Sequence, residues 1–131
     1  MKKITIYCLI AVLLLTLTAC NAKTPSDTGQ TTATYTKEFS YLPAYGSMEY
    51  QSLTQTPQKQ STARYLIKNT TPEKVLNGYA DILKNDGWTI NWSYTKDKKP
   101  ASLVAQKDNH IVAMLPQQTG NNVLLIITGS T

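Results

Sequence analysis

Cysteine and histidine are almost absent from this chain. Its 131 residues include two cysteines, Cys8 and Cys20, and a single histidine, His110. A cysteine and histidine metal centre needs about four such ligands at short spacings, and the sequence has no such group. Acidic residues are also few, with eight Asp and Glu in total, and no two share a motif of the kind that hydrolases or calcium loops use. We therefore expect no metal, no cofactor and no enzymatic activity.

The sequence also lacks a long apolar run. The longest uncharged stretch near its start, from Ile4 to Leu17, has about 14 residues, whereas a membrane-spanning helix needs roughly 20. Lys2 and Lys3 precede this run, and the small residues Thr18 and Ala19 follow it. A basic start, an apolar centre and a small-residue step are the three parts of a secretory signal peptide.

The four residues Leu17-Thr18-Ala19-Cys20 resemble the bacterial lipobox, in which an apolar residue and two small residues precede an invariant cysteine. The resemblance implies cleavage between Ala19 and Cys20, attachment of diacylglycerol to the Cys20 thiol, and further acylation, for example with palmitate. Each buried methylene contributes about 0.8 kcal/mol and one myristoyl-length chain holds only marginally, so two or three acyl chains make a lasting anchor. Cys8 leaves with the signal peptide, and no disulfide can then form within one mature copy.

A lipoprotein signal also predicts where the protein lies. We expect an extracytoplasmic lipid anchor, on the outer face of the membrane in a Gram-positive cell. In a Gram-negative cell, Asn21 is not the aspartate associated with inner-membrane retention, which favours the periplasmic face of the outer membrane. The formal net charge of the whole chain is only +5, and a chain in this compartment gives no reason to expect nucleic-acid binding.

Composition divides the chain into three parts. Residues 1–19 are the predicted signal peptide, and residues 20–38 are the lipidated cysteine and a tether rich in Thr, Ser, Gly and Pro. Such a segment has little to bury, so we expect it to be flexible. Aromatic and aliphatic residues appear together from Phe39 onward, and we expect one domain over residues 39–131.

The domain sequence predicts one helix and several strands. Thr71, Pro72 and Glu73 form a helix start, Gly87 marks its end, and we expect a helix from Pro72 to Asp86. Strands are expected at 48–54, 62–68, 88–94, 101–107, 111–115 and 123–128, with short connections between the last four. These elements predict an α+β fold of two layers, with one amphipathic helix packed on an antiparallel sheet of four to six strands. Gly78 interrupts the helix, and we expect it where the helix closely approaches the sheet.

Residues 42–128 resemble a recurrent uncharacterised module of small bacterial lipoproteins. The similarity rests on Leu42-Pro43-Ala44-Tyr45-Gly46, on the helical residues Tyr79 and Leu83, and on Asp86-Gly87-Trp88 before a strand meander. The resemblance implies the fold and carries no activity with it.

Three candidate sites remain. The last two strands are apolar on both faces, and we expect Val112, Met114, Leu124 and Ile126 to form a partner or ligand face, unless residues 39–54 fold across it or these strands are central. Lys96, Lys98 and Lys99 lie at one hairpin tip, where they form either a solvated turn or a contact with an anionic surface. His110 lies two residues from Asp108, in what is either a turn or an acid–base pair.

The function expected from these observations is a lipid-anchored envelope protein that serves as a non-catalytic binding or assembly module. Its partners are then the membrane, through acyl chains on Cys20, and an envelope protein. Two alternatives stay open: a carrier of a small apolar ligand on the second sheet face, and an enzyme accessory with a site near His110.

Replacement of Cys20 by alanine should release the protein from membranes, because no thiol is then left to carry the acyl chains. Fractionation of cells that express Cys20→Ala, followed by immunoblotting, measures this release. Cys8→Ser is the matched control and should stay membrane-bound. Persistent membrane association of Cys20→Ala would overturn the predicted anchor.

Overall fold

The structure is a computed structural model that describes residues 33–130. The signal peptide expected at 1–19, the lipidation and cleavage positions Cys20 and Ala19, and the larger part of the expected tether lie outside the described residues.

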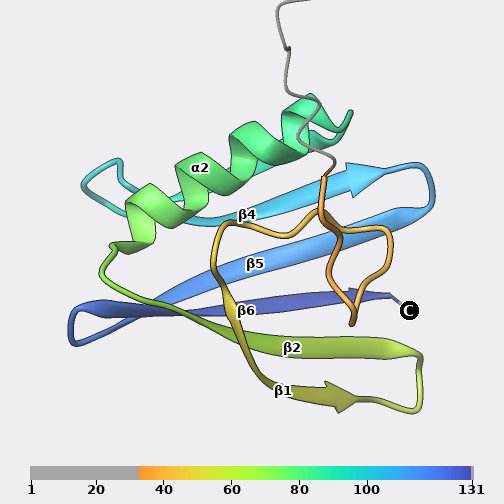
Figure 1. Ribbon diagram of the computed structural model, residues 1–131. Helices are drawn as coiled ribbons and strands as arrows, with labels where there is room; N and C mark the ends of the chain where they lie inside the picture. Colours follow the sequence, from red (N-terminus) through yellow and green to blue (C-terminus); the bar gives the residue numbers. More distant parts are fainter. Residues whose placement is uncertain (1–32, 131) are drawn as a thin grey trace, which may run out of the picture. The chain divides into compact units, whose positions relative to one another are not determined.

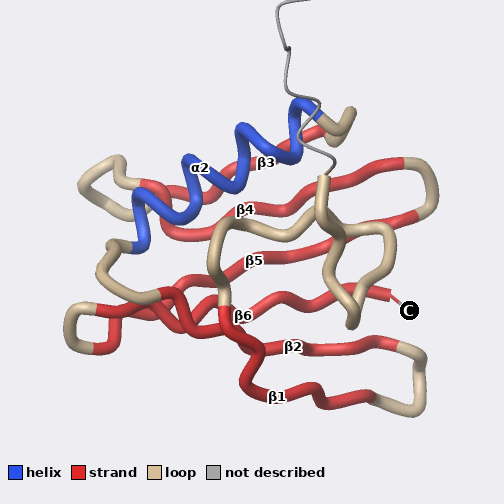
Figure 2. The backbone as a smooth tube through the Cα atoms, viewed as in Figure 1, coloured by secondary structure: helices blue, strands red, loops and turns tan. Residues whose placement is uncertain are grey.

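One helix and six strands form the described domain. In chain order they are β1 (Glu49–Gln55), β2 (Gln60–Ile67), α2 (Pro72–Asn85), β3 (Thr89–Tyr94), β4 (Pro100–Lys107), β5 (His110–Thr119) and β6 (Asn122–Ser130). The strands pair antiparallel in the order β1-β2-β6-β5-β4-β3 (Figures 1 and 2). The predicted α+β fold, with a helix on an antiparallel sheet, is confirmed. Strands β3 to β6 form the expected meander, and β2 pairs with the last strand, β6.

The ends of α2 follow from local chemistry. The Thr71 hydroxyl accepts the backbone N–H of Lys74, and proline occupies the first turn, where its missing N–H leaves no hydrogen bond unmade. At the other end Gly87 has φ +85°, and the N–H groups of Gly87 and Trp88 bond the carbonyls of Lys84 and Leu83. These two bonds form a Schellman motif, which ends the helix one residue before the predicted Asp86.

The inner face of the sheet is covered by two pieces of chain. Helix α2 packs on β3, β4 and β5, and the loop segment 33–48 lies beside it on the same side of the sheet (Figures 1 and 2). From this segment Phe39 and Leu42 are fully buried in the core. Residues 39–48 therefore complete the helix layer, and they do not fold across the second face of the sheet.

Segment 33–48 is held by its own hydrogen bonds. The Thr36 N–H donates to the Leu42 carbonyl at 2.9 Å, and the Ala44 N–H donates to the Thr34 carbonyl at 2.6 Å. The Thr36 hydroxyl, in a residue only 6% exposed, exchanges bonds with the backbone of Phe39. Residues 34–38 are thus part of the fold, and the domain boundary predicted at residue 39 falls inside this segment.

Tyr79 links the segment to the helix. Its side chain is fully buried, and its hydroxyl donates a 2.5 Å hydrogen bond to the Pro43 carbonyl. Its ring stacks on Tyr45 with 5.5 Å between ring centroids. Burial raises the pKa of the Tyr79 hydroxyl, which keeps it protonated as a donor. Gly78 lies under the same Tyr45 ring, so its close neighbour is segment 33–48. The sequence analysis had predicted the sheet as this neighbour, and that prediction is wrong.

The predicted orientation of β5 is wrong. Val112 and Met114, which we expected on the outer face, are buried beneath the helix layer. Their neighbours Ile111, Ala113 and Leu115 point the other way. Both alternating sets on β5 are apolar, so composition could not choose between them. The pairing of Val112 with Gly129 and of Met114 with Ile127 on β6 fixes the choice, since directly opposed residues share a face.

The Gly78 contact predicts a coupling between two positions. An alanine Cβ at residue 78 would lie 2.8 Å from Tyr45 Cε2, closer than carbon atoms approach in folded proteins. In a Tyr45→Ala background, Gly78→Ala should stabilise the fold by up to about 1 kcal/mol through helix propensity. With Tyr45 present this gain should be lost or reversed, because the ring must leave its stack on Tyr79.

Urea unfolding of the four proteins in this double-mutant cycle measures the coupling. Equal effects of Gly78→Ala in both backgrounds would refute the contact.

Candidate interaction surface

The outer face of the sheet carries a continuous apolar patch. Strand registry places residues of the same face side by side: Leu66 opposes Leu124, Ile126 opposes Leu115, and Ala113 opposes Val104. Directly opposed side chains on a sheet have Cβ atoms about 5 Å apart and contact one another. We define the outer patch as Leu66, Val104, Ile111, Ala113, Leu115, Leu124 and Ile126, which come from β2, β4, β5 and β6.

The outer patch is open to solvent. Ile111 is 53% exposed, Leu115 46% and Val104 37%, and Leu66, Leu124 and Ile126 are partly exposed. The layer formed by α2 and segment 33–48 lies on the opposite face (Figure 2). The predicted partner-face residues Leu124 and Ile126 do lie on this surface. The other five residues of the outer patch were not selected by the sequence analysis: Leu66, Val104, Ile111, Ala113 and Leu115.

Charge is nearly absent from the outer face. The side chains that surround the patch are mainly hydroxyls and amides, including a pair, Thr62 and Thr128, whose hydroxyls are 3.0 Å apart. Arg64 of β2 is on this face, opposite Ile126, and Glu49 on β1 lies at its edge in an ion pair with Lys68. From β3, β4, β5 and β6 no charged side chain projects on this side in the part of the chain that the structure describes.

One end of the outer patch is hollowed. A shallow depression lies among Gln60, Asn109, Ile111, Ala113, Thr128, Gly129 and Ser130. Ile111 and Ala113 of β5 give its lining apolar groups, and the other side chains that line it carry hydroxyl or amide groups. The depression can receive a side chain or small group of mixed character, and it is continuous with the patch through Ile111 and Ala113.

The lysine-rich hairpin lies between β3 and β4. Lys96, Lys98 and Lys99 are all exposed, and Lys98 has φ +59°. The Thr95 N–H bonds the Lys99 carbonyl at 2.9 Å, and the Lys98 N–H bonds the Thr95 carbonyl at 3.0 Å. Within residues 33–130 none of these three lysines forms an ion pair. The arrangement is a tight charged turn that leaves the ammonium groups in water.

His110 and Asp108 are not brought together. Within the described residues no hydrogen bond or ion pair joins them, and Asp108 takes the turn conformation with φ +52°. The His110 ring instead stacks on Tyr41, with 3.8 Å between ring centroids. The Tyr41 hydroxyl donates to the Ser130 carbonyl, and burial raises the pKa of that hydroxyl. This stack fastens segment 33–48 to the sheet.

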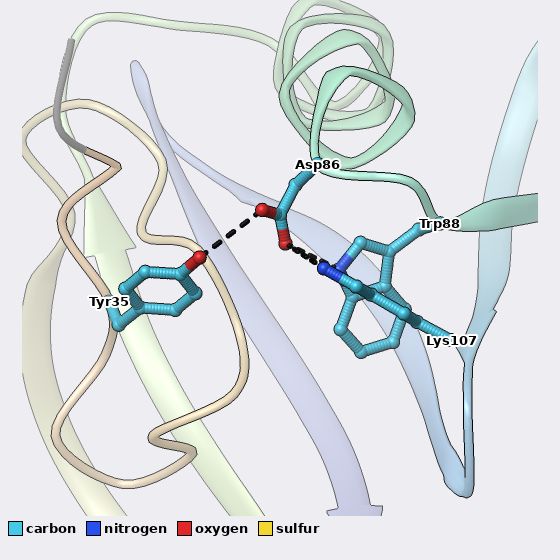
Figure 3. Close-up of polar contacts among 4 residues, drawn as sticks. All are labelled: Tyr35, Asp86, Trp88 and Lys107. Atoms are coloured by element: carbon cyan, nitrogen blue, oxygen red, sulfur yellow. Dashed lines mark hydrogen bonds and ion pairs between the residues drawn. The ribbon is translucent and has the colours of Figure 1, made fainter. Parts of the chain in front are cut away.

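A polar cluster of four residues lies at the C-terminal end of α2 (Figure 3). The Asp86 carboxylate accepts bonds from Lys107 Nζ at 3.0 Å, Trp88 Nε1 at 3.1 Å and the Tyr35 hydroxyl at 3.2 Å. Burial by itself would raise the pKa of Asp86, but these hydrogen bonds and the positive charge of Lys107 outweigh it and hold the pKa below its ordinary value. Asp86 therefore ties together segment 33–48, the helix end and β4.

Comparison with protein-family models, with curated proteins and with solved structures finds no match to this chain. Among residues 33–130, no helix has both the length and the hydropathy needed to cross a membrane. In the same residues no three His, Cys, Asp or Glu side chains come together in a group that could hold a metal ion.

The Asp86 cluster predicts a pH-dependent contribution to stability. Asp86→Asn should lower the free energy of unfolding by about 1–3 kcal/mol at neutral pH, since it removes the charge that Lys107 faces. The folded pKa of Asp86 is depressed, so its contribution is present above the unfolded value of 3.8 and is lost as the pH falls through the folded pKa.

Urea unfolding at pH 7 and at the lowest pH where the fold persists tests this. The difference between Asp86→Asn and the wild type should shrink at low pH. Asp81→Asn, on the exposed side of the same helix, is the matched control and should change stability little at either pH. An equal loss for both variants would contradict the assigned role of Asp86.

Proposed function

We propose that this protein is a lipid-anchored module of the bacterial cell envelope that binds a protein partner through the outer patch. The observation that carries the proposal is the apolar, nearly uncharged face that runs across β2, β6, β5 and β4 without a covering layer. Contiguous apolar surface on a small domain usually marks an interaction site. The centre of the outer patch has few charges, and hydroxyl and amide groups surround it. Protein interfaces have the same composition, with an uncharged core and a polar rim.

The energetics favour an occupied outer patch. Full burial of a Leu or Ile side chain contributes about 1.5–3 kcal/mol. Ile111 and Leu115 are each about half exposed, so a partner that covers them and Val104 gains several kcal/mol before association entropy is counted.

The lipid anchor and the outer patch serve one role in this proposal. Acyl chains on Cys20 hold the protein at the membrane surface, and the residues between Cys20 and residue 33 separate the domain from the headgroups. The chemistry near His110 supports binding more than catalysis, because the ring is stacked on Tyr41 and does not contact a carboxylate.

A second candidate is a carrier of a small apolar ligand. The depression beside Ile111 and Ala113 favours it, since a compact molecule with one polar end would place its apolar part on the patch and its polar end near Asn109 or Ser130. Binding of this kind would bury only part of the outer patch.

A photo-reactive amino acid at residue 115 should crosslink to protein in intact cells, because Leu115 lies at the centre of the outer patch. The same amino acid at residue 74, exposed on the helix layer, is the matched control and should give little adduct. Immunoblots and mass spectrometry of the adducts read the result. Equal yields at the two positions would refute the outer patch as the binding surface, and an adduct with a lipid-sized molecule at 115 would favour the carrier.

A further inference from the structure

The outer face combines features that suit contact with a copy of itself. An interface between identical copies brings each surface against the same surface, so any concentrated charge would meet its own sign. The outer face has no charged side chain from strands β3, β4, β5 and β6, and its charges, Arg64 and the Glu49–Lys68 ion pair, lie together on the β1 and β2 side. Two such faces can meet without repulsion between like charges over their central strands.

The strand order allows two copies of the sheet to be related by a two-fold axis. In the order β1-β2-β6-β5-β4-β3 the centre of the sheet lies between β6 and β5, where Ile126 opposes Leu115. A two-fold axis parallel to the strands at this centre places β6 of one copy over β5 of the other, and β2 over β4. Arg64 then meets the β4 residue at its own height along the strands, Ser102, and not the Arg64 of the other copy.

The available area matches what a stable dimer needs. Six strands about 4.8 Å apart, each with about seven residues that rise about 3.3 Å, give a face of about 29 by 23 Å, or about 650 Å². If the whole outer face is covered, the outer patch together with the hydroxyl and amide side chains around it, two copies bury about 1,300 Å² in total, at the low end of the range of about 1,200–2,000 Å² for stable protein interfaces. Two sheets that pack in this way lie about 10 Å apart and make an aligned β-sandwich.

The path of the chain leaves this face free. The first described residues run along the helix layer, where Tyr35 bonds Asp86 at the end of α2 (Figure 3). In the two-fold arrangement the helix layers of both copies point outward, so the first described residues lie on the side away from the interface. Two copies anchored in one membrane also face each other at a raised effective concentration.

We infer that the outer patch is covered by the outer patch of a second copy of this chain, which makes the membrane-anchored form a face-to-face homodimer. This inference rests on the proposed function and names the partner for the same surface. Leu115 of each copy packs on Ile126 of the other, so the two Leu115 residues lie next to the two-fold axis.

A cysteine crosslink tests the dimer in membranes. Leu115→Cys is introduced into two differently tagged copies that are expressed together, and a short bismaleimide is added to isolated membranes. We expect an adduct of twice the mass of one chain that carries both tags. Lys74→Cys on the helix layer and the wild-type chain, which keeps Cys20, are the matched controls and should give no such adduct.

A second substitution tests the apolar contact itself. Leu124→Lys, added to Leu115→Cys, places an ammonium group inside the interface, two residues from Ile126 on β6, and should reduce the yield of the two-tag adduct by more than about tenfold. Thermal unfolding of both variants confirms that they remain folded. An unchanged yield would overturn the inference.

The crosslinking results distinguish failure of the homodimer inference from failure of the proposed binding function. An adduct at residue 115 with a different protein, and none with both tags, overturns the homodimer and leaves the proposed binding function in place. No adduct of any kind at residue 115 in a folded protein, either with bismaleimide or with the photo-reactive amino acid, overturns both proposals. A two-tag adduct of equal yield at residues 74 and 115 overturns the face-to-face arrangement.

Discussion

Tyr79 joins the two pieces of chain that together cover one face of the sheet. A helix with its side chains is about 10 Å wide, whereas six strands span about 29 Å, so α2 cannot cover the sheet alone. Segment 33–48 covers a further part of this face, while Tyr50 and Leu53 of β1 stay exposed. The segment has no regular secondary structure to hold it in shape. The buried bond from Tyr79 to the Pro43 carbonyl and the stack on Tyr45 fix this segment to the helix. The inner core, with Phe39 and Leu42, depends on that connection.

Two further contacts complete the same layer. Asp86 binds Tyr35 at one end of the segment and Lys107 of β4, and His110 stacks on Tyr41 above the end of β6. These polar and aromatic residues are of types that often form catalytic or binding sites. Here they hold the loop segment 33–48 in place. The chemistry of the helix side is structural, and the surface left for recognition is the other face of the sheet.

The domain is one-sided as a result. All of the chain between residues 33 and 48 is used on the helix layer, and the remaining connections between helix and strands are short. Within the described residues nothing is left to cover Ile111, Leu115 and Val104. A lipid anchor suits such a domain, because attachment to a surface concentrates the copies or partners that cover the face. In this proposal the anchor and the uncovered face are parts of one mechanism.

The sequence by itself determined the elements whose signals are local. The cap at Thr71, the left-handed glycine at Gly87 and the period-two pattern of the strands specify backbone geometry over a few residues, and the helix, the meander and the α+β class were predicted from them. Tertiary structure alone decided which face of β5 is buried, because both of its faces are apolar and only registry with β6 selects one. It also decided that segment 33–48 lies beside α2 and that Asp86 meets Tyr35, since these contacts join residues 36 to 51 positions apart and leave no periodic trace in the sequence.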